Sequence, residues 1–209
     1  MNDAPPVRID ARKPVVRPRD AASLILLRGE GKTLEVLAGR RPLHVKFMPG
    51  VYVFPGGAID PPDRIAWSVE SRIEALGSKL ARSARAALRE TWEEAGVLVG
   101  CPGSRPSALP ASAPVEQAYL DRGLVAAMDL LTYVGRAITP SHSFRRFNTR
   151  FFLCDGRNVF GEPAASDQQI TALEGRLSRA LPPLYRSFRA ASNGFQQQSP
   201  FYLKTLRRR

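Results

Sequence analysis

The sequence predicts an α/β fold of the α+β kind, in which helices pack on the faces of one mixed β-sheet. Short apolar runs typical of strands, such as 22–27 and 131–138, lie on either side of one long helical pattern at 78–95. Strands and helices do not alternate regularly, as they would in a doubly wound parallel sheet. The 209 residues fit one domain with tails. We therefore expect a single mixed-sheet sandwich.

The N-terminal half of the domain is predicted to consist of short strands joined by turns. The β-prone runs 22–27 and 33–38 flank a glycine-containing turn, which predicts a hairpin. A further strand is predicted at 51–54, and we expect it to end at Pro55 with the adjacent glycines Gly56 and Gly57.

The helix predicted at 78–95 has the clearest period in the chain. Leu80, Ala84 and Leu88 fall at spacings of four on one face, and Gly96 stands where a C-terminal glycine cap belongs. Three large aromatic residues of this half of the chain are expected to lie in the core: Phe47, Tyr52 and Trp92.

The second half of the chain is less regular. Residues 100–114 are rich in proline and serine and predict a loop. Weaker patterns predict helices at 115–128, 167–181 and 184–191, and strands at 131–138 and 149–153.

Composition excludes several classes of protein. Only two cysteines are present, so no disulfide framework exists. No apolar run approaches the ~20 residues of a membrane-spanning helix, and the N-terminus lacks the apolar core of a signal peptide. We expect a cytoplasmic protein with no membrane partner, built from a flexible arm at 1–20, a domain at 21–191 and a basic tail at 192–209.

The net charge of +12 is concentrated near the C-terminus. Residues 175–209 carry eight positive charges and no acidic residue, so nucleic acid is expected to bind only through this tail, if at all. The polar composition of the tail predicts that removal of 195–209 leaves the melting temperature nearly unchanged. The alternative is that its aromatic residues dock on the sheet as a final strand or helix.

Three glutamates near the end of the 78–95 helix carry the chemistry. Glu90 lies one turn from Glu94 and three residues from Glu93, so the carboxylates share a face, where like charges repel. Their negative charges also lie near the negative end of the helix dipole, which repels them. A solvated acidic face is the default interpretation of such a pair. A divalent cation would reverse both penalties, because Mg²⁺ and Mn²⁺ prefer oxygen ligands.

These residues resemble the signature of the Nudix hydrolases, G-x5-E-x7-R-E-U-x-E-E-x-G-U, in which U is a bulky apolar residue. The second half of the signature matches the run from Arg89, with Thr91 in the first apolar position as a departure. The first half begins at Gly57 and places Asp63 where the family has glutamate. Asp63 and Arg89 stand 26 positions apart, more than the family's eight, because an insertion at 64–82 interrupts the box.

The resemblance implies an α/β/α sandwich of the Nudix type and a pyrophosphohydrolase that depends on Mg²⁺ or Mn²⁺. Such an enzyme cleaves the diphosphate bond of a nucleoside diphosphate linked to another group. Glu90 and Glu94 are implied as cation ligands, and Glu93 as a third ligand or the catalytic base. Arg89 is implied to orient a glutamate, and Gly57 to bring a backbone carbonyl to the cation.

The segment from Arg40 to Gly57 also resembles the branch with an interrupted box, which includes coenzyme A diphosphatases of the peroxisomal type. Coenzyme A or an acyl-CoA is therefore the leading substrate, with ADP-ribose, dinucleoside polyphosphates and NDP-sugars as alternatives. The residues expected to bind substrate are Arg40, Arg41, Gly56, Arg145 and Arg146, since arginine suits bidentate contacts with phosphate. Surface charge is an equally good interpretation of Arg145 and Arg146.

Two points stay open at this stage. A homodimer is one alternative for the oligomeric state. The rival function is a catalytically inactive Nudix-fold protein that binds RNA or other polyanions through its basic tail.

Overall fold

The computed structural model describes residues 16–41, 43–44, 48–71, 77–103, 111, 113–156, 159–161, 171 and 201–205. Most of the predicted arm at 1–20, nearly all of the helix predicted at 167–181 and all of the helix at 184–191 lie outside the described residues, as does Phe47.

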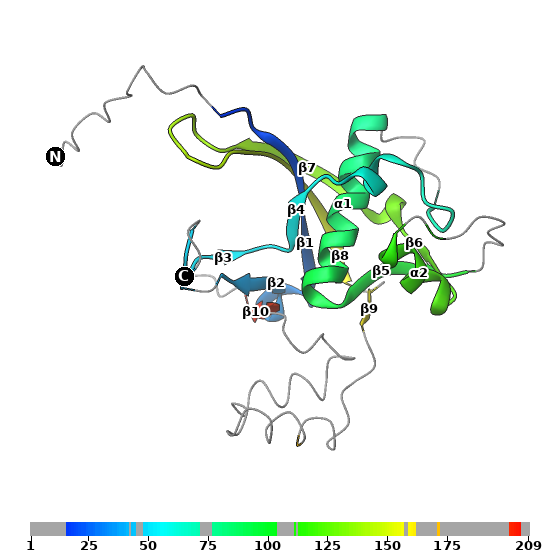
Figure 1. Ribbon diagram of the computed structural model, residues 1–209. Helices are drawn as coiled ribbons and strands as arrows, with labels where there is room; N and C mark the ends of the chain where they lie inside the picture. Colours follow the sequence, from blue (N-terminus) through cyan, green and yellow to red (C-terminus); the bar gives the residue numbers. More distant parts are fainter. Residues whose placement is uncertain are drawn as a thin grey trace.

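A seven-stranded mixed sheet forms one side of the domain (Figure 1). Its main path runs β10-β2-β1-β8-β7, while β3 pairs with β2 and β4 pairs with β1. Neighbours are antiparallel, except that β1 and β8 run parallel over nine residue pairs. The strands are β1 Arg19–Arg28, β2 Glu35–Arg40, β3 Tyr52–Val53, β4 Gly56–Ala58, β7 Thr132–Ile138, β8 Phe147–Asp155 and β10 Phe201–Thr205. The predicted α+β mixed sheet is confirmed.

One edge of β1 is shared between two partners, β2 and β4. The strand predicted at 51–54 is present as β3 and ends before Pro55, but Gly56 and Gly57, predicted only to end it, belong to the further strand β4. The pairs that β1 makes with β2 lie at its C-terminal end, at Leu27 and Arg28. Its first half pairs instead with β4, and the amide of Leu24 donates to the carbonyl of Pro55 at 3.0 Å. A side chain on Gly56 would collide with the β1 backbone, so only glycine permits this close pairing.

A second, three-stranded sheet lies on the other side of the domain, in the order β6-β5-β9. Its strands are β5 Val97–Pro102, β6 Leu124–Ala126 and β9 Val159–Gly161. Helix α2, Pro114–Asp121, precedes β6. The loop was predicted to begin at residue 100, but strand β5 continues to Pro102, so the start of that prediction was wrong. The helix predicted to reach 128 ends early, because Gly123 adopts a φ of 60° and the chain turns into β6.

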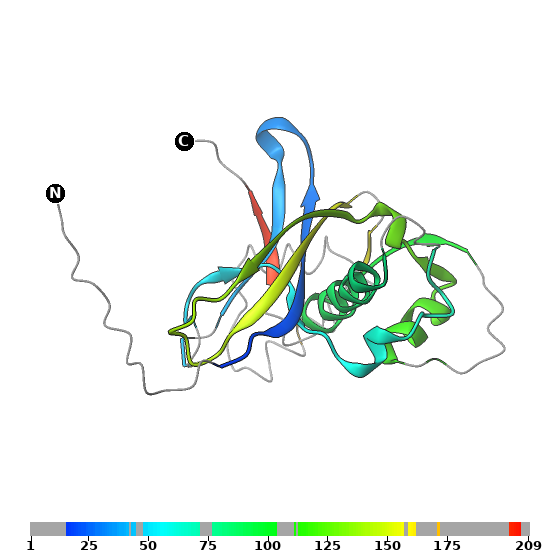
Figure 2. The same cartoon turned by 90° about the horizontal axis from the view of Figure 1, so that it is seen from above.

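Helix α1, Ser78–Ala95, lies between the two sheets and packs against β1, β4 and β5 (Figure 2). Its bounds are those predicted, and Gly96 ends it with a φ of 68°. Alanines such as Ala84, Ala86 and Ala87 are fully buried and let the helix approach the sheets closely. None of the described helices is long and apolar enough to cross a membrane.

The first part of the insertion predicted at 64–82 packs into the core and is not an exposed loop. After the 3₁₀ turn η2, Pro61–Arg64, the side chains of Trp67 and Val69 are buried at 2% and 1% exposure. Glu70 forms a buried ion pair with Arg85 of α1 at 2.6 Å. The start of the insertion predicted at 64–82 is thus fixed to the helix that carries the glutamates. The remaining 3₁₀ turns are η1 Gly31–Thr33 and η3 Met128–Leu130.

The predicted basic tail contains the strand β10. Its five residues pair in antiparallel register with β2, from Phe201 opposite Gly39 to Thr205 opposite Glu35. This pairing supports the alternative in which the tail docks on the sheet, and it gives a backbone partner to the edge of β2 that lies opposite β1 and β3.

We predict that deletion of residues 201–209 lowers the melting temperature by more than ~5 °C, because it removes a whole edge strand from the sheet. Deletion of 206–209 alone is the control, since these residues follow β10 and include three of the arginines. Thermal melts of both variants and the full chain measure the effect. Equal melting temperatures for all three proteins would show that β10 does not stabilise the fold.

Candidate functional site

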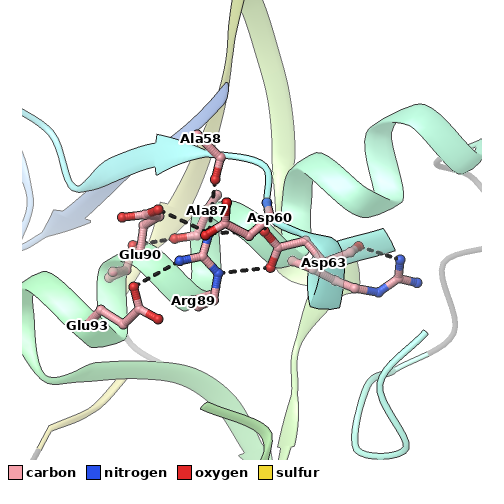
Figure 3. Close-up of polar contacts among 9 residues, drawn as sticks. Ala58, Asp60, Asp63, Ala87, Arg89, Glu90 and Glu93 are labelled. Carbon is pink, nitrogen blue, oxygen red and sulfur yellow. Dashed lines mark hydrogen bonds and ion pairs between the residues drawn. The ribbon is translucent and has the colours of Figure 1, made fainter. Parts of the chain in front are cut away.

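The guanidinium group of Arg89 forms the centre of a polar cluster on the C-terminal half of α1 (Figure 3). Only 6% of its side chain is exposed. Nε and Nη2 donate to the two carboxylate oxygens of Asp63 at 3.0 Å each. Nη1 donates to Glu93 at 2.9 Å, and Nη2 also donates to the carbonyl of Ala58 at 3.0 Å. All three nitrogens are engaged, so the orientation of the side chain is fixed.

Asp63 is completely buried and balances the charge of Arg89. It lies in η2, where its carboxylate also accepts the amide of Asp60 at 2.8 Å. Burial by itself lowers the pKa of Arg89, but the hydrogen bonds and charge of Asp63, together with the charges of Glu90 and Glu93, outweigh it, so the net pKa is raised. Since an isolated buried charge is costly, each of these two groups requires the other.

Glu90 lies against the backbone of β4. Its carboxylate is 15% exposed and pairs with Nη2 of Arg89 at 3.0 Å. A Cβ atom placed on Gly57 would overlap this carboxylate, so glycine is required at this position. Burial raises the pKa of Glu90, and the positive charge of Arg89 opposes that shift.

Glu94 lies one turn further along α1, beside the same strand. Its Oε2 accepts the amide of Gly56 at 2.9 Å. Burial is the largest cause that raises the pKa of Glu94, the hydrogen bond from Gly56 opposes the shift and the charge of Glu90 adds to it, and the resulting pKa is about 7. Two carboxylates therefore flank the paired glycines of β4, and both are ionised at a cost in the folded chain.

Glu93 has a different environment from the other two glutamates. Its side chain is 41% exposed and is held by Arg89 at the helix spacing of four. The departure at Thr91 has a simple local explanation: this residue is buried, and its hydroxyl donates to the carbonyl of Ala87 at 2.7 Å. Threonine therefore fits the apolar position without an unsatisfied hydroxyl.

A cleft of about 590 Å³ opens beside Glu94. Two of the predicted substrate-binding arginines, Arg41 and Arg145, line it together with Gly56 and Gly57. Its apolar wall includes the aromatic residues Tyr52, Phe54, Phe147 and Phe151. The cleft thus joins an acidic end, two cations and a set of aromatic rings.

Successive side chains of β8 point to opposite faces of the sheet, and this explains which face carries the aromatic wall of the cleft. Phe152 is fully buried in the core, so its neighbour Phe151 points to the opposite face of the sheet. Tyr52, predicted in the core, is 44% exposed and lines the cleft, which corrects that prediction. Trp92 is half-buried and packs against the core.

The other two predicted substrate-binding arginines do not line this cleft. Arg40 donates to the carbonyl of Gly50 at 3.3 Å. Arg146 donates to the carbonyls of Thr139, at 3.1 Å, and Val16, at 2.8 Å. Both side chains bind backbone where they stand, and they connect loops near the cleft.

Comparison with known proteins identifies the family. No protein-family model matches the chain. A protein of Caenorhabditis elegans named "Putative nudix hydrolase 7" is 34% identical over 145 residues, which is 65% of this chain and 43% of that protein. The crystal structure of a NUDIX hydrolase from Alicyclobacillus acidocaldarius is 32% identical, covers 86% of this chain and 94% of its own, and superposes with a TM-score of 0.54. The chain belongs to the Nudix hydrolase family. It spans less than half the length of the C. elegans protein.

The two segments that the resemblance assigns to the Nudix box meet in space. Asp63, which the resemblance places at the first acidic position of the box, binds Arg89 through both carboxylate oxygens although the two residues are 26 positions apart in sequence. Sequence reasoning left Asp63 without a defined role. The usable signal was its position, six residues after Gly57.

The residues present fit a divalent cation that is completed by other ligands. Within the described part of the chain, no three acidic, histidine or cysteine side chains already form a cation site. Glu90 and Glu94 supply two hard oxygen ligands beside the Gly57 backbone, and both have raised pKa values that a cation would lower. Mg²⁺ is often bound by one or two carboxylates together with water and substrate phosphates, which matches this donor set.

We predict that Glu94→Gln raises the melting temperature of the chelator-treated protein at pH 8, by at least ~3 °C. The pKa of about 7 exceeds the ordinary value of 4.5, so ionisation is disfavoured in the folded state. The carboxyl therefore stabilises the fold fully below pH 4.5 and loses that contribution as the pH rises to 7.

The measurement is a pair of thermal melts in EDTA, at pH 5 and pH 8, with Glu35→Gln as the control because Glu35 lies in an exposed ion pair with Arg28. The gain from Glu94→Gln should shrink toward zero at pH 5. A gain of the same size at both pH values would exclude a raised pKa at Glu94.

Proposed function

We propose that this Nudix protein is a Mg²⁺- or Mn²⁺-dependent hydrolase that cleaves the diphosphate bond of a nucleoside diphosphate linked to another group. The observation that carries the proposal is the Arg89 cluster, which holds Glu90 and Glu93 near the glycines of β4. Glu94, one turn along α1 from Glu90, accepts the amide of Gly56 and lines the cleft. A bound cation would offset the charge of the diphosphate and lower the pKa of the attacking water.

The three glutamates differ in burial, and we assign their proposed roles from this difference. Glu90 and Glu94 are the more enclosed pair and face β4, so they are the proposed cation ligands, together with the carbonyl of Gly57. Glu93 is exposed and hydrogen-bonded to Arg89, a position from which it can reach water as a base or serve as a further ligand. Arg89 is a positioning residue, because it acts through the acids it binds.

The cleft supports a substrate with a charged centre and an apolar or aromatic extension. Arg41 and Arg145 are placed to contact phosphate oxygens, and the Gly56 backbone approaches the acidic end. The rings of Tyr52 and Phe151 offer flat apolar surface to a base or an acyl arm. Coenzyme A or an acyl-CoA is the leading substrate, and ADP-ribose, dinucleoside polyphosphates and NDP-sugars form the rest of the panel.

We predict that hydrolysis of a substrate from this panel requires added Mg²⁺ or Mn²⁺ and stops in excess EDTA. Glu90→Gln should lower kcat by at least ~100-fold without unfolding the chain, because it removes a ligand at the same side-chain volume. Asp129→Asn is the matched control, since this exposed acid lies outside the Arg89 cluster and accepts a hydrogen bond from Ser71. Product masses identify the bond that is cleaved.

The same assay tests the rival function. If the wild-type chain and Glu93→Gln were equally inert on every substrate, while RNA binding by the wild-type chain fell steeply with salt, the protein would be a polyanion-binding member of the family. Full activity in excess EDTA would contradict the cation site itself.

A further inference from the structure

A second hollow, of about 460 Å³, lies at the end of the large sheet where β1 begins and where the hairpin of β7 and β8 runs alongside it (Figure 1). We call it the arginine pocket. Five arginines line it: Arg17, Arg19, Arg64, Arg82 and Arg136. Among the described residues, Asp20 is the one acidic side chain in its lining. None of these arginines belongs to the Nudix box or to the cleft beside Glu94.

The carboxylate of Asp20 is already engaged. Its Oδ1 accepts the amide of Asn148 at 2.6 Å and lies 3.4 Å from Arg150, while Oδ2 pairs with Arg82 at 3.3 Å. Arg136 donates to the side-chain oxygen of Asn148, a neutral partner. One carboxylate therefore serves Arg82 and Arg150, and it leaves the charges of the other four lining arginines without a matching acid in the lining.

Two further observations concern pocket arginines whose polar atoms have no acidic partner among the described residues. The Nε atom of Arg82 is buried and makes no hydrogen bond within the described part of the chain. Among the described residues, no acidic side chain forms an ion pair with Arg17 or Arg64. Arg17 precedes β1 and Arg64 ends η2, and both line the same hollow. Like charges gathered from distant segments repel one another, and a bound anion would offset that repulsion.

We propose that the arginine pocket binds a phosphate group. Guanidinium groups match phosphate oxygens in planar, two-point contacts, and several of them around one hollow favour a multiply charged anion over chloride. The site lies outside the proposed catalytic machinery and extends the function beyond hydrolysis at the box.

The phosphate has two sources that share this chemistry. It is either a remote phosphate of a substrate whose diphosphate lies in the cleft, or a separate phosphate-bearing ligand. The two hollows adjoin, because Ile138 at the end of β7 lines both.

The test is a calorimetric titration with inorganic pyrophosphate in EDTA, at low salt, so that binding needs neither a cation nor turnover. The double variant Arg17→Gln, Arg64→Gln removes two exposed side chains from the pocket. We expect it to weaken binding at least ~10-fold. The double variant Arg28→Gln, Lys32→Gln removes the same charge from the distant hairpin turn and should bind as the wild-type chain does.

Wild-type protein that does not bind pyrophosphate would overturn the proposal, and so would equal loss of affinity in both double variants. Loss confined to Arg41→Gln, Arg145→Gln would assign the binding to the cleft and overturn it as well. Since no hydrolysis is measured, these outcomes are independent of the proposed enzyme activity.

A kinetic experiment then distinguishes the two sources of the phosphate. It rests on the proposed function, because it compares KM values for hydrolysis. A rise in KM for coenzyme A but not for its dephospho form, in the pocket variant, supports a remote substrate phosphate. Unchanged KM for both, with the titration lost, supports a separate phosphate-bearing ligand.

Discussion

The buried pair of Arg89 and Asp63 is the constraint on which the site depends. Both side chains are almost without exposure, so neither charge is tolerable alone. Because Asp63 fixes two nitrogens of the guanidinium, the third is directed at Glu93 and the remaining edge at Glu90 and the backbone of β4. A single ion pair in the core thereby connects η2, the strand and the helix that carries the acids.

The glycines of β4 convert this scaffold into a place for a ligand. Gly56 lets the strand run close to β1, and Gly57 lets the carboxylate of Glu90 approach the backbone. The result is a pair of partly enclosed carboxylates whose pKa values are raised by burial. Such a pair weakens the fold when it stands alone, and a bound cation would make it favourable. The proposed cation site thus explains why the fold tolerates two carboxylates that are costly to ionise.

The sequence predicted those parts of the fold that depend on interactions between residues close together in the chain. The bounds of α1 followed from its period and from Gly96, and the hairpin of β1 and β2 from its glycine turn. Strand β4 was missed because glycine has low strand propensity and only the pairing with β1 makes it a strand. The place of Asp63 was hidden by the insertion, whose residues Trp67 and Glu70 pack into the core through contacts far apart in sequence.

The central claim is that the acids beside Gly57 form a divalent-cation site, and a Mn²⁺ titration followed by the electron paramagnetic resonance signal of the free ion tests it most directly. The account predicts that the wild-type chain and the Glu35→Gln control bind Mn²⁺ alike. It predicts that the Glu90→Gln, Glu94→Gln double variant, still folded, binds at least ~100-fold more weakly. Equal Mn²⁺ affinity in the double variant and the wild-type chain would contradict the account.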